Sequence, residues 1–390
     1  MDFTIPEELE MLQKLVRDFV KKELMPLEKM VIENEAKRGL ENTPLLPEDI
    51  EIGLLNKAKE LGLWGLDVPE EYGGANLGFL AKAIVTEELA KTIVPFTLPP
   101  DAPNLHFLME CCTEEQKDRY LIPYANGEKK SAIAISEPNA GSDISGMQTT
   151  AIKKGKKWII NGTKIWISSA NNADFFITMA VTDPEKRQRG GITAFLIDKD
   201  TPGLKVARGI PTIGYQHPYE VYFDSVEVDE GQVLGKLGEG FIPMQNRLVV
   251  RRLEMAQRSV GMAERLLSMM KEHANQRKTF GKYLSERQAV QWWVANSAID
   301  IHATRLMSYH AAWKMDNGVK DIRHDASMLK VFGTEMAMRV ADRAIQVHGA
   351  MGLTKDLPIE FMYRNIRSLR IIEGASEIHR WTIAREILKR

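Results

Sequence analysis

The sequence predicts a multidomain α+β protein in which helices, a compact β-domain and a helical bundle follow one another along the chain. Three observations predict this order. Apolar residues recur at helical spacing up to about residue 112, short β-branched runs separated by turn signals occupy residues 131–228, and long helical patterns return from residue 240. A chain of 390 residues is long enough for two or three domains with a substantial core.

The first region is predicted to be helical. Thr4 and Glu7 have the spacing of a capping box, and Leu9, Leu12 and Val16 begin one apolar stripe behind it. Pro26 interrupts or ends this helix, because proline lacks the backbone N–H that a helix interior needs. Two further helices are predicted over residues 52–61 and 79–92.

Six short runs are predicted as strands, at residues 132–135, 157–160, 165–167, 175–181, 192–197 and 220–223. No helical pattern alternates with them, which favours a compact β-domain over a parallel α/β fold. Three long helical patterns follow, near residues 241–275, 286–316 and 322–348, and a last helix begins near Ser376. Long helices joined by short loops predict an antiparallel bundle.

Composition excludes several classes of protein. The formal net charge of −1 argues against binding of nucleic acid or an anionic membrane surface by charge alone. The only cysteines, Cys111 and Cys112, exclude a disulfide scaffold, and no Cys/His cluster has zinc-site spacing, so we expect no metal. The N-terminus lacks the basic start and apolar core of a signal peptide, and no apolar run approaches a membrane span. We therefore expect a cytoplasmic protein.

Five segments contain residues suited to ligand binding or catalysis, and each also has a purely structural interpretation. The polar loop 136–143 offers hydroxyl and backbone donors, or is a turn between strands. Trp166 and Ser168 share one strand face, where the tryptophan is equally a core residue. The segment 277–281 suits a phosphate or a solvated helix end. The glycines of 346–352 are typical of a helix cap.

The fifth segment, 371–377, places Glu373 behind two isoleucines on a glycine turn before a helix. A carboxylate in apolar surroundings has a raised pKa and can act as a general base, whereas a glutamate at a helix start usually only complements the helix dipole. No GxGxxG follows a strand, and no P-loop, GxSxG or HExxH is present, so the common nucleotide and hydrolase motifs are not supported.

Taken together and in this order, the five segments resemble the acyl-CoA dehydrogenase family over essentially the whole chain. They are SEPNAGSD at 136–143, NGTKIWIS at 161–168, RKTFGK at 277–282, QVHGAMG at 346–352 and IIEGASEIHR at 371–380. The resemblance implies an N-terminal helical domain over 1–125, a central β-barrel-like domain over 126–236 and a C-terminal four-helix bundle over 237–390. It also implies one FAD per subunit and a homotetramer or homodimer.

The resemblance assigns residues to the flavin and the substrate. The cofactor-binding residues would be Ile135, Ser136, Ser142, Trp166, Ile167, Ser168, Arg277, Thr279, Phe280, Gln288, Gln346, Val347, Gly349, Ala350, Ser376 and Glu377. Of these, Arg277 to Gln288 and the 346–350 segment would bind the FAD of a neighbouring subunit. The substrate-binding residues would be Ser142, Arg252, Glu373 and Gly374.

The resemblance also implies a reaction. Glu373 matches the catalytic base of the larger branch of the family; another branch carries its base near residue 251, where this chain has Arg251. A protonated guanidinium cannot accept a proton, so the base is assigned to Glu373. It would remove the α-proton of an acyl-CoA while the β-hydride passes to FAD N5, giving a trans-2-enoyl-CoA, as in β-oxidation of fatty acids. We expect apolar surroundings that exclude water to strengthen this base.

Arg251 departs from the medium-chain pattern and predicts a polar or unusual acyl group. Its pocket would include residues near 92–100 and 245–249. Electron-transfer flavoprotein is the expected acceptor, because the oxidases of the family usually carry an additional domain. The alternatives are the same fold with different chemistry (an oxidase or an elimination) and a flavin-bearing protein associated with DNA, for which the net charge of −1 leaves little room.

Overall fold

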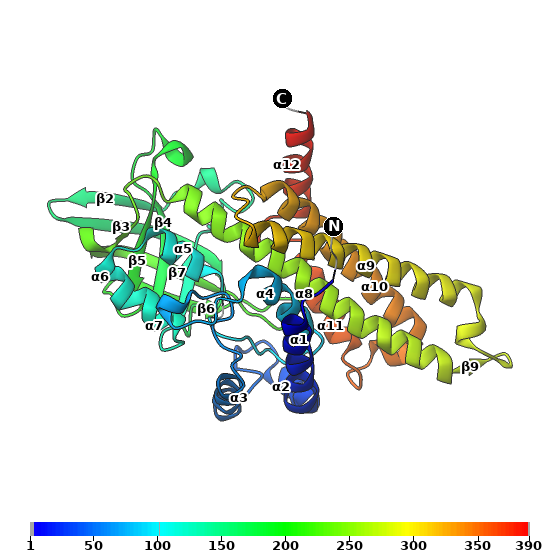
Figure 1. The fold of residues 1–390 in the computed structure, drawn as a ribbon. Coiled ribbons are helices and arrows are strands. Elements are labelled where there is room, and N and C mark those ends of the chain that lie inside the picture. Colours follow the sequence, from blue (N-terminus) through cyan, green and yellow to red (C-terminus); the bar gives the residue numbers. More distant parts are fainter. Residues whose placement is uncertain (1–3, 101, 389–390) are drawn as a thin grey trace.

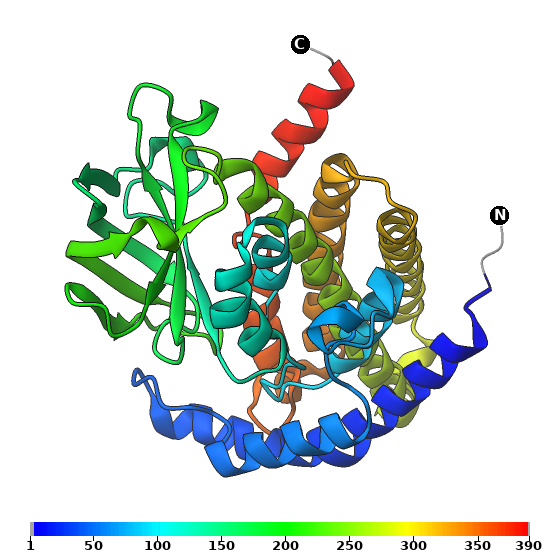
Figure 2. The same ribbon diagram turned by 60° about the vertical axis from the view of Figure 1, so that its left-hand side comes forward.

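The computed structural model describes residues 4–100 and 102–388. It has the predicted order: a β-domain lies at one end of an elongated helical bundle, and the N-terminal helices pack across the junction (Figure 1). Figure 2, turned by 60°, shows the β-domain to the left of the bundle and the first helices curving along its base.

The N-terminal region contains α1 (Glu7–Phe19), α2 (Glu28–Arg38), α3 (Glu48–Glu60), α4 (Gly78–Leu89), α5 (Asn104–Cys111), α6 (Glu114–Gln116) and α7 (Ile122–Ala125). The predicted capping box at Thr4 is wrong, because Pro6 occupies the N-cap of α1 and no side chain caps the helix. Pro26 does interrupt the helix: a π-helical turn and a 3₁₀ turn separate α1 from α2. Val16 and Phe19, which continue the predicted apolar stripe, are buried.

The β-domain contains β1 (Ser131–Ala134), β2 (Thr150–Lys154), β3 (Lys157–Ile167), β4 (Phe175–Val181), β5 (Ile192–Asp198), β6 (Leu204–Gly209), β7 (Tyr219–Asp229) and β8 (Val233–Leu234). These form one eight-stranded sheet in the order β6-β7-β3-β2-β4-β5-β8, with β1 paired in parallel to β4. Every residue of β4 is buried, so this strand lies at the centre of the domain. The predicted strands 157–160 and 165–167 are the two ends of the single strand β3, which is interrupted by bulges.

The bundle contains α8 (Phe241–Gln276), α9 (Gln288–Asp316), α10 (Arg323–His348), α11 (Ile359–Leu369) and α12 (Ser376–Leu388), and a small hairpin of β9 (Lys278–Thr279) and β10 (Lys282–Tyr283) joins α8 to α9. The three long helices agree with the predicted ranges, whereas α11 was not predicted. The core of the bundle is continuous with that of the N-terminal helices, because Val16 and Phe19 belong to the same buried cluster as Val260, Met336 and Val340.

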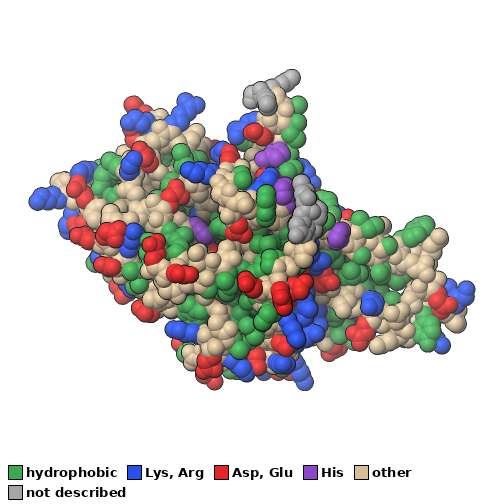
Figure 3. Space-filling model, viewed as in Figure 1, with side chains coloured by type: hydrophobic (Ala, Val, Ile, Leu, Met, Phe, Trp, Pro, Cys, Tyr) green, Lys and Arg blue, Asp and Glu red, His purple; other side chains and the backbone are tan. Residues whose placement is uncertain are grey.

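Two features of the surface bear on function. The helix α12 projects from the body of the molecule, and acidic and basic side chains are interspersed over the face seen in Figure 3, as the near-neutral charge predicts. Within the described ranges, no helix is long and apolar enough to cross a membrane.

Candidate active site

Glu373 lies on the short turn between α11 and α12, in the left-handed region of backbone conformation at φ 57°, and Gly374 follows at φ 100°. A residue other than glycine rarely adopts this conformation unless its surroundings impose it. Here three side chains of the bundle hold the backbone of the turn in this conformation. Arg252 Nε on α8 donates to the carbonyl oxygen of Glu373 at 3.1 Å, and His379 Nε2 lies 3.3 Å from the same oxygen. Lys330 on α10 donates to the carbonyl of Gly374.

These supporting groups are themselves buried. Burial, with Arg252 nearby, lowers the pKa of Lys330 to about 8, and burial with Arg252 and Lys330 lowers the pKa of His379 to about 4. His379 is therefore neutral at physiological pH, and its Nδ1 lies 3.1 Å from Ser327 Oγ. A neutral imidazole has one N–H, and a carbonyl oxygen can only accept, so Nε2 donates to Glu373 O and Nδ1 accepts from the Ser327 hydroxyl.

The carboxylate of Glu373 faces α8, where its neighbours are arginines. Arg247 Nη1 lies 3.3 Å from Glu373 Oε2, and Arg251 Nε lies 3.8 Å from Oε1. Arg247 is only 4% exposed and is fixed on its other side, where its Nε donates to Asn104 Oδ1 at 3.0 Å. The expectation of apolar surroundings for this carboxylate is therefore wrong, because two guanidinium groups lie within 4 Å of it.

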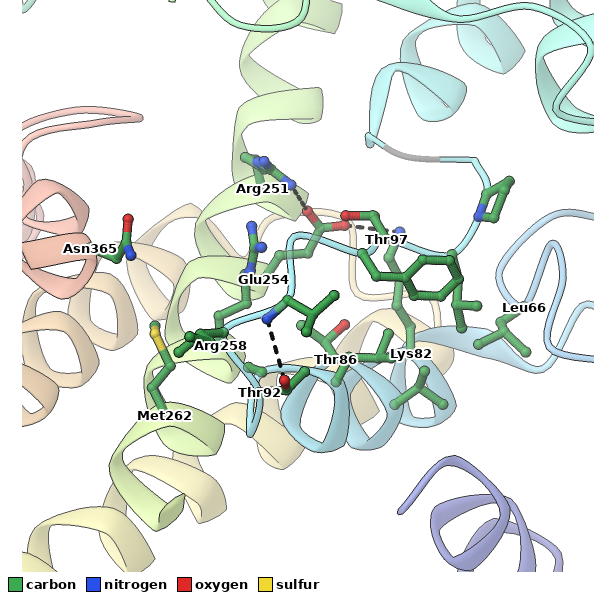
Figure 4. Close-up of a pocket in the computed structure, with 18 of the residues that line it drawn as sticks. Leu66, Lys82, Thr86, Thr92, Thr97, Arg251, Glu254, Arg258, Met262 and Asn365 are labelled. Atoms are coloured by element: carbon green, nitrogen blue, oxygen red, sulfur yellow. Dashed lines mark hydrogen bonds and ion pairs between the residues drawn. The ribbon is translucent and has the colours of Figure 1, made fainter. Parts of the chain in front are cut away.

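A cavity of about 140 Å³ opens beside Arg251. It lies between α4, the segment 92–100, α8 and α11 (Figure 4). Its walls are mostly apolar: Val85, Leu89, Ile93, Val94, Phe96, Leu98, Met262, Phe361 and Met362. The predicted pocket segment 92–100 does line the cavity. The predicted residues 245–249 do not, because the α8 residues that line it lie further along the helix, from Arg251 to Met262.

That face of α8 carries charge. Arg251, Glu254, Arg258 and Met262 follow one another at steps of three and four, which places them on one side of the helix. Arg251 Nη1 pairs with Glu254 Oε2 at 2.8 Å. Arg258 is half-buried and lines the cavity with no hydrogen-bond or ion-pair partner among residues 4–100 and 102–388. The cavity therefore offers a guanidinium that no described side chain neutralises.

Glu254 belongs to a buried charged network that reaches α4. Lys82 Nζ on α4 lies 3.0 Å from Glu254 and 2.6 Å from Asp67, and His106 Nε2 lies 3.0 Å from Asp67. Burial opposes ionisation of Glu254, but Lys82 and Arg251 outweigh it and lower its pKa to about 2. Burial likewise opposes the charge on Lys82, and the two carboxylates beside it raise its pKa nevertheless. Asp67, Lys82 and Glu254 are therefore charged at neutral pH.

The two predicted flavin segments of the β-domain lie side by side. Ile165 N donates to Ser136 O at 2.9 Å, and buried Lys164 donates to Ile135 O at 3.0 Å. Trp166 adopts φ 64° in the bulge of β3 and is 54% exposed, with the exposed Ser168 two residues further on. A flat exposed ring beside hydroxyl donors suits a planar heteroaromatic ligand. The side chains of Ile135 and Ile167 are buried in the core.

The remaining predicted cofactor residues lie elsewhere on the chain. Arg277, Thr279, Phe280 and Gln288 surround the β9–β10 hairpin, at the end of the bundle opposite the β-domain (Figure 1). The 346–350 segment is close to them, because His348 stacks on His273 of α8 at 4.5 Å. Phe280 is 98% exposed and Val347 is buried. Near the catalytic turn, Ser376 is buried and Glu377 is exposed.

Several residues of the site were not predicted from the sequence: Asn104, Arg247, Glu254, Arg258, Lys330 and His379. The three on α8, Arg247, Glu254 and Arg258, were detectable in principle. Charged residues at positions 247, 251, 254 and 258 repeat with helical spacing in a segment otherwise typical of a bundle core, and buried charges require partners. Lys330 and His379 gave no such signal, because their role depends on how α10 and α12 meet the turn.

Comparison with known proteins agrees with this architecture. The acyl-CoA dehydrogenase N-terminal, middle and C-terminal domain models match residues 6–128, 132–226 and 238–388. Together they span most of the chain, which therefore belongs to the acyl-CoA dehydrogenase family. It is an oxidoreductase, and the fold class predicted from the sequence is confirmed.

Three relatives are informative. The (R)-benzylsuccinyl-CoA dehydrogenase of Thauera aromatica is 48% identical over 100% of this chain and 97% of its own length. The solved glutaryl-coenzyme A dehydrogenase in complex with glutaryl-CoA superposes with a TM-score of 0.89 at 32% identity, covering 100% of this chain and 97% of that one. PigA, solved as an FAD complex, has a TM-score of 0.89 at 30% identity, with 99% of each chain covered. The cofactor predicted here, FAD, is thus one that the family binds.

Proposed function

We propose that the chain catalyses the α,β-dehydrogenation of an acyl-CoA thioester, with Glu373 as the base that removes the α-proton. The observation that carries this proposal is the position of Glu373: a carboxylate held on a left-handed turn, contacting Arg247 and Arg251, the second of which lines the cavity. Arg252, His379 and Lys330 fix the backbone of that turn, so the carboxylate is oriented before a substrate arrives.

FAD is the proposed cofactor. Ser136, Ser142, Trp166 and Ser168 would hold its ring system against the β-domain, and the exposed indole of Trp166 supports this. When bound, the flavin supplies the acceptor for the hydride that leaves the β-carbon. The protein's part is to bind the thioester, to keep water from the cavity with its apolar walls, and to take the α-proton on the Glu373 carboxylate.

We propose a homotetramer. The flavin residues of the β-domain and those around Arg277 lie at opposite ends of one chain, so a complete flavin site requires a second copy (Figure 1). The helix α9 exposes a large apolar side chain at every seventh position: Trp292, Ile299, Leu306 and Trp313. Such a stripe is typical of a surface that another helix covers.

The acyl group is proposed to carry a carboxylate remote from the thioester. Arg251 and Arg258 line a cavity whose other walls are mostly apolar, and a guanidinium is the side chain best suited to bind a carboxylate. Two relatives are named for such acyl groups, benzylsuccinyl and glutaryl. The rings of Phe96 and Phe361 in the walls are compatible with an aromatic substituent.

A panel of acyl-CoA thioesters tests this function. Anaerobic mixing of the FAD-loaded protein with each thioester should bleach the flavin, most rapidly for dicarboxylic monothioesters. Glu373→Gln keeps the side-chain size but cannot take the proton, so it should bind FAD normally and lose about 10²–10⁴-fold in rate. Wild-type bleaching rates in that variant would contradict the assignment. Steady-state assays with electron-transfer flavoprotein or dioxygen as acceptor decide between a dehydrogenase, as we propose, and an oxidase.

A further inference from the structure

Arg251 contacts a carboxylate on each side. Its Nη1 lies 2.8 Å from Glu254 within the cavity wall, and its Nε lies 3.8 Å from Glu373 at the catalytic turn. The contact with Glu373 is the longer of the two, beyond hydrogen-bonding distance. Figure 4 shows the Arg251 side chain leaving α8 toward the carboxylate of Glu254.

The groups around Arg251 are held by further contacts of their own. Lys82 holds Glu254 at 3.0 Å and is anchored in turn by Asp67 at 2.6 Å. Arg247, the other cation at Glu373, has a side chain only 5% exposed, against 20% for that of Arg251, and is bound to Asn104. Of the two guanidinium groups within 4 Å of the Glu373 carboxylate, that of Arg251 has the longer contact and the more exposed side chain, and Arg251 is also the one that borders the space for the acyl group.

Arg258 stands apart from the ion pairs that surround the cavity. Arg247, Arg251 and Lys82 face Glu373, Glu254 and Asp67 in the contacts described above. Arg258 adds a cation that no described side chain neutralises. A carboxylate bound in the cavity would supply the missing negative charge, and it would compete with Glu373 for Arg251.

A cation beside a carboxylate stabilises its ionised form and so opposes uptake of a proton. We propose that Arg251 couples substrate choice to catalysis: a remote carboxylate on the acyl group draws its guanidinium away from Glu373, and an acyl group without one leaves the contact in place. This rests on the proposed function, since Glu373 must be the base. The protein then discriminates between acyl groups by the rate of proton removal as well as by binding affinity.

Two acyl-CoA thioesters of equal length test the coupling: glutaryl-CoA, which carries the remote carboxylate, and valeryl-CoA, which ends in a methyl group. Limiting rates of flavin bleaching and half-saturating concentrations are measured with the FAD-loaded protein. Arg251→Gln should raise the limiting rate with valeryl-CoA by about tenfold, because the opposing cation is gone. The same variant should require more glutaryl-CoA for half-saturation. An unchanged valeryl-CoA rate in Arg251→Gln would overturn the proposal, because a residue that only binds the carboxylate cannot affect a substrate that lacks one.

A second variant should shift the valeryl-CoA rate in the opposite direction. Glu254→Gln removes the carboxylate that holds Arg251 toward the cavity, so Arg251 should approach Glu373 and the valeryl-CoA rate should fall. A rise in Glu254→Gln would contradict the coupling. The affinity for the enoyl-CoA products, measured by calorimetry, gives a readout without flavin reduction. Arg251→Gln should weaken the binding of glutaconyl-CoA and leave the binding of 2-pentenoyl-CoA unchanged.

The control is Arg323→Gln, which removes an exposed guanidinium paired with Asp321 and should change neither rate. The outcomes separate the two proposals. If no thioester bleaches the wild-type flavin, the proposed function fails. If thioesters bleach it but Arg251→Gln leaves the valeryl-CoA rate unchanged, only the coupling fails.

Discussion

Arg247 Nη1 lies 3.3 Å from Glu373 Oε2 although the two residues are 126 positions apart in the sequence. Arg247 is almost completely buried and also holds Asn104, whose side chain donates to Ser131 Oγ at 2.9 Å at the start of β1. One guanidinium thus connects the catalytic turn, the bundle, the N-terminal helices and the β-domain.

This arrangement predicts the effect of Arg247→Lys. The lysine keeps the charge but cannot contact Asn104 and Glu373 in the geometry of a guanidinium fork, so the carboxylate loses its orientation. A displacement of about 1 Å can cost on the order of 10²-fold in rate, and we expect a loss of about 10–100-fold in flavin reduction with FAD still bound. Stopped-flow bleaching measures the rate. A wild-type rate in Arg247→Lys would mean that a positive charge at position 247 is enough to orient the Glu373 carboxylate.

Gly374→Ala should displace the catalytic turn. Gly374 has φ 100°, and a Cβ there would lie 2.9 Å from His379 Nε2. We expect a loss of about 1–3 kcal/mol in the free energy of unfolding together with slow flavin reduction. Gly155→Ala is the matched control, because Gly155 has φ 62° in the β2–β3 turn and nothing lies within 4 Å of the added carbon. Its stability should fall while flavin reduction is retained.

The buried His379 predicts a loss of stability in acid. Its pKa is lowered from 6.5 to about 4, chiefly by burial and then by Arg252 and Lys330. The unfolded chain therefore binds a proton between these two values that the folded chain does not. The stabilisation of the fold that comes from keeping His379 neutral and buried is present in full above pH 6.5. As the pH falls toward 4, the free energy of unfolding decreases on this account by about 3 kcal/mol at most. Thermal unfolding of wild type and His379→Gln across this window should show a flatter pH dependence in the variant.

Lys82→Met should strongly destabilise the fold. It would leave Asp67 and Glu254 buried without the ammonium that now lies 2.6 and 3.0 Å from them. Breaking a buried pair in this way typically costs about 3–5 kcal/mol. The exposed pair of Lys22 with Asp18 gives the control, and Lys22→Met should cost less than about 1 kcal/mol. If urea unfolding gave equal losses of unfolding free energy for Lys82→Met and Lys22→Met, the buried network would contribute little to stability.

Ile299→Lys tests the apolar stripe on α9. Ile299 is 65% exposed in the described chain, and a lysine there should separate subunits that bury it. Light scattering after size-exclusion chromatography should give a smaller species, with FAD lost at the same time. The same change at Ile152, which is 56% exposed on β2, should leave the assembly intact. A tetramer unaffected by Ile299→Lys would place the interface elsewhere.

Periodicity predicted the long helices and the central strands closely, because each buries one face against a neighbour. The bounds of α9, Gln288–Asp316, and of β4, Phe175–Val181, are within a few residues of the predicted ones. Short elements such as β8 and α6 were missed, since a few residues carry too little pattern. At the candidate active site, the motif at 371–380 predicted Glu373. It could not reveal Arg247 or Lys330, because their contacts with the turn exist only once α8 and α10 pack beside it.

The separation of the two sets of flavin residues also has a genetic consequence. A chain with a damaged Trp166 face still carries an intact Arg277 end, and a chain damaged at Arg277 still carries an intact Trp166 face. If each flavin is shared between two subunits, as we propose, co-expression of two inactive alleles of opposite kind would place both intact halves at some sites of a mixed assembly. Partial activity would return, whereas two alleles damaged in the same half would not complement each other.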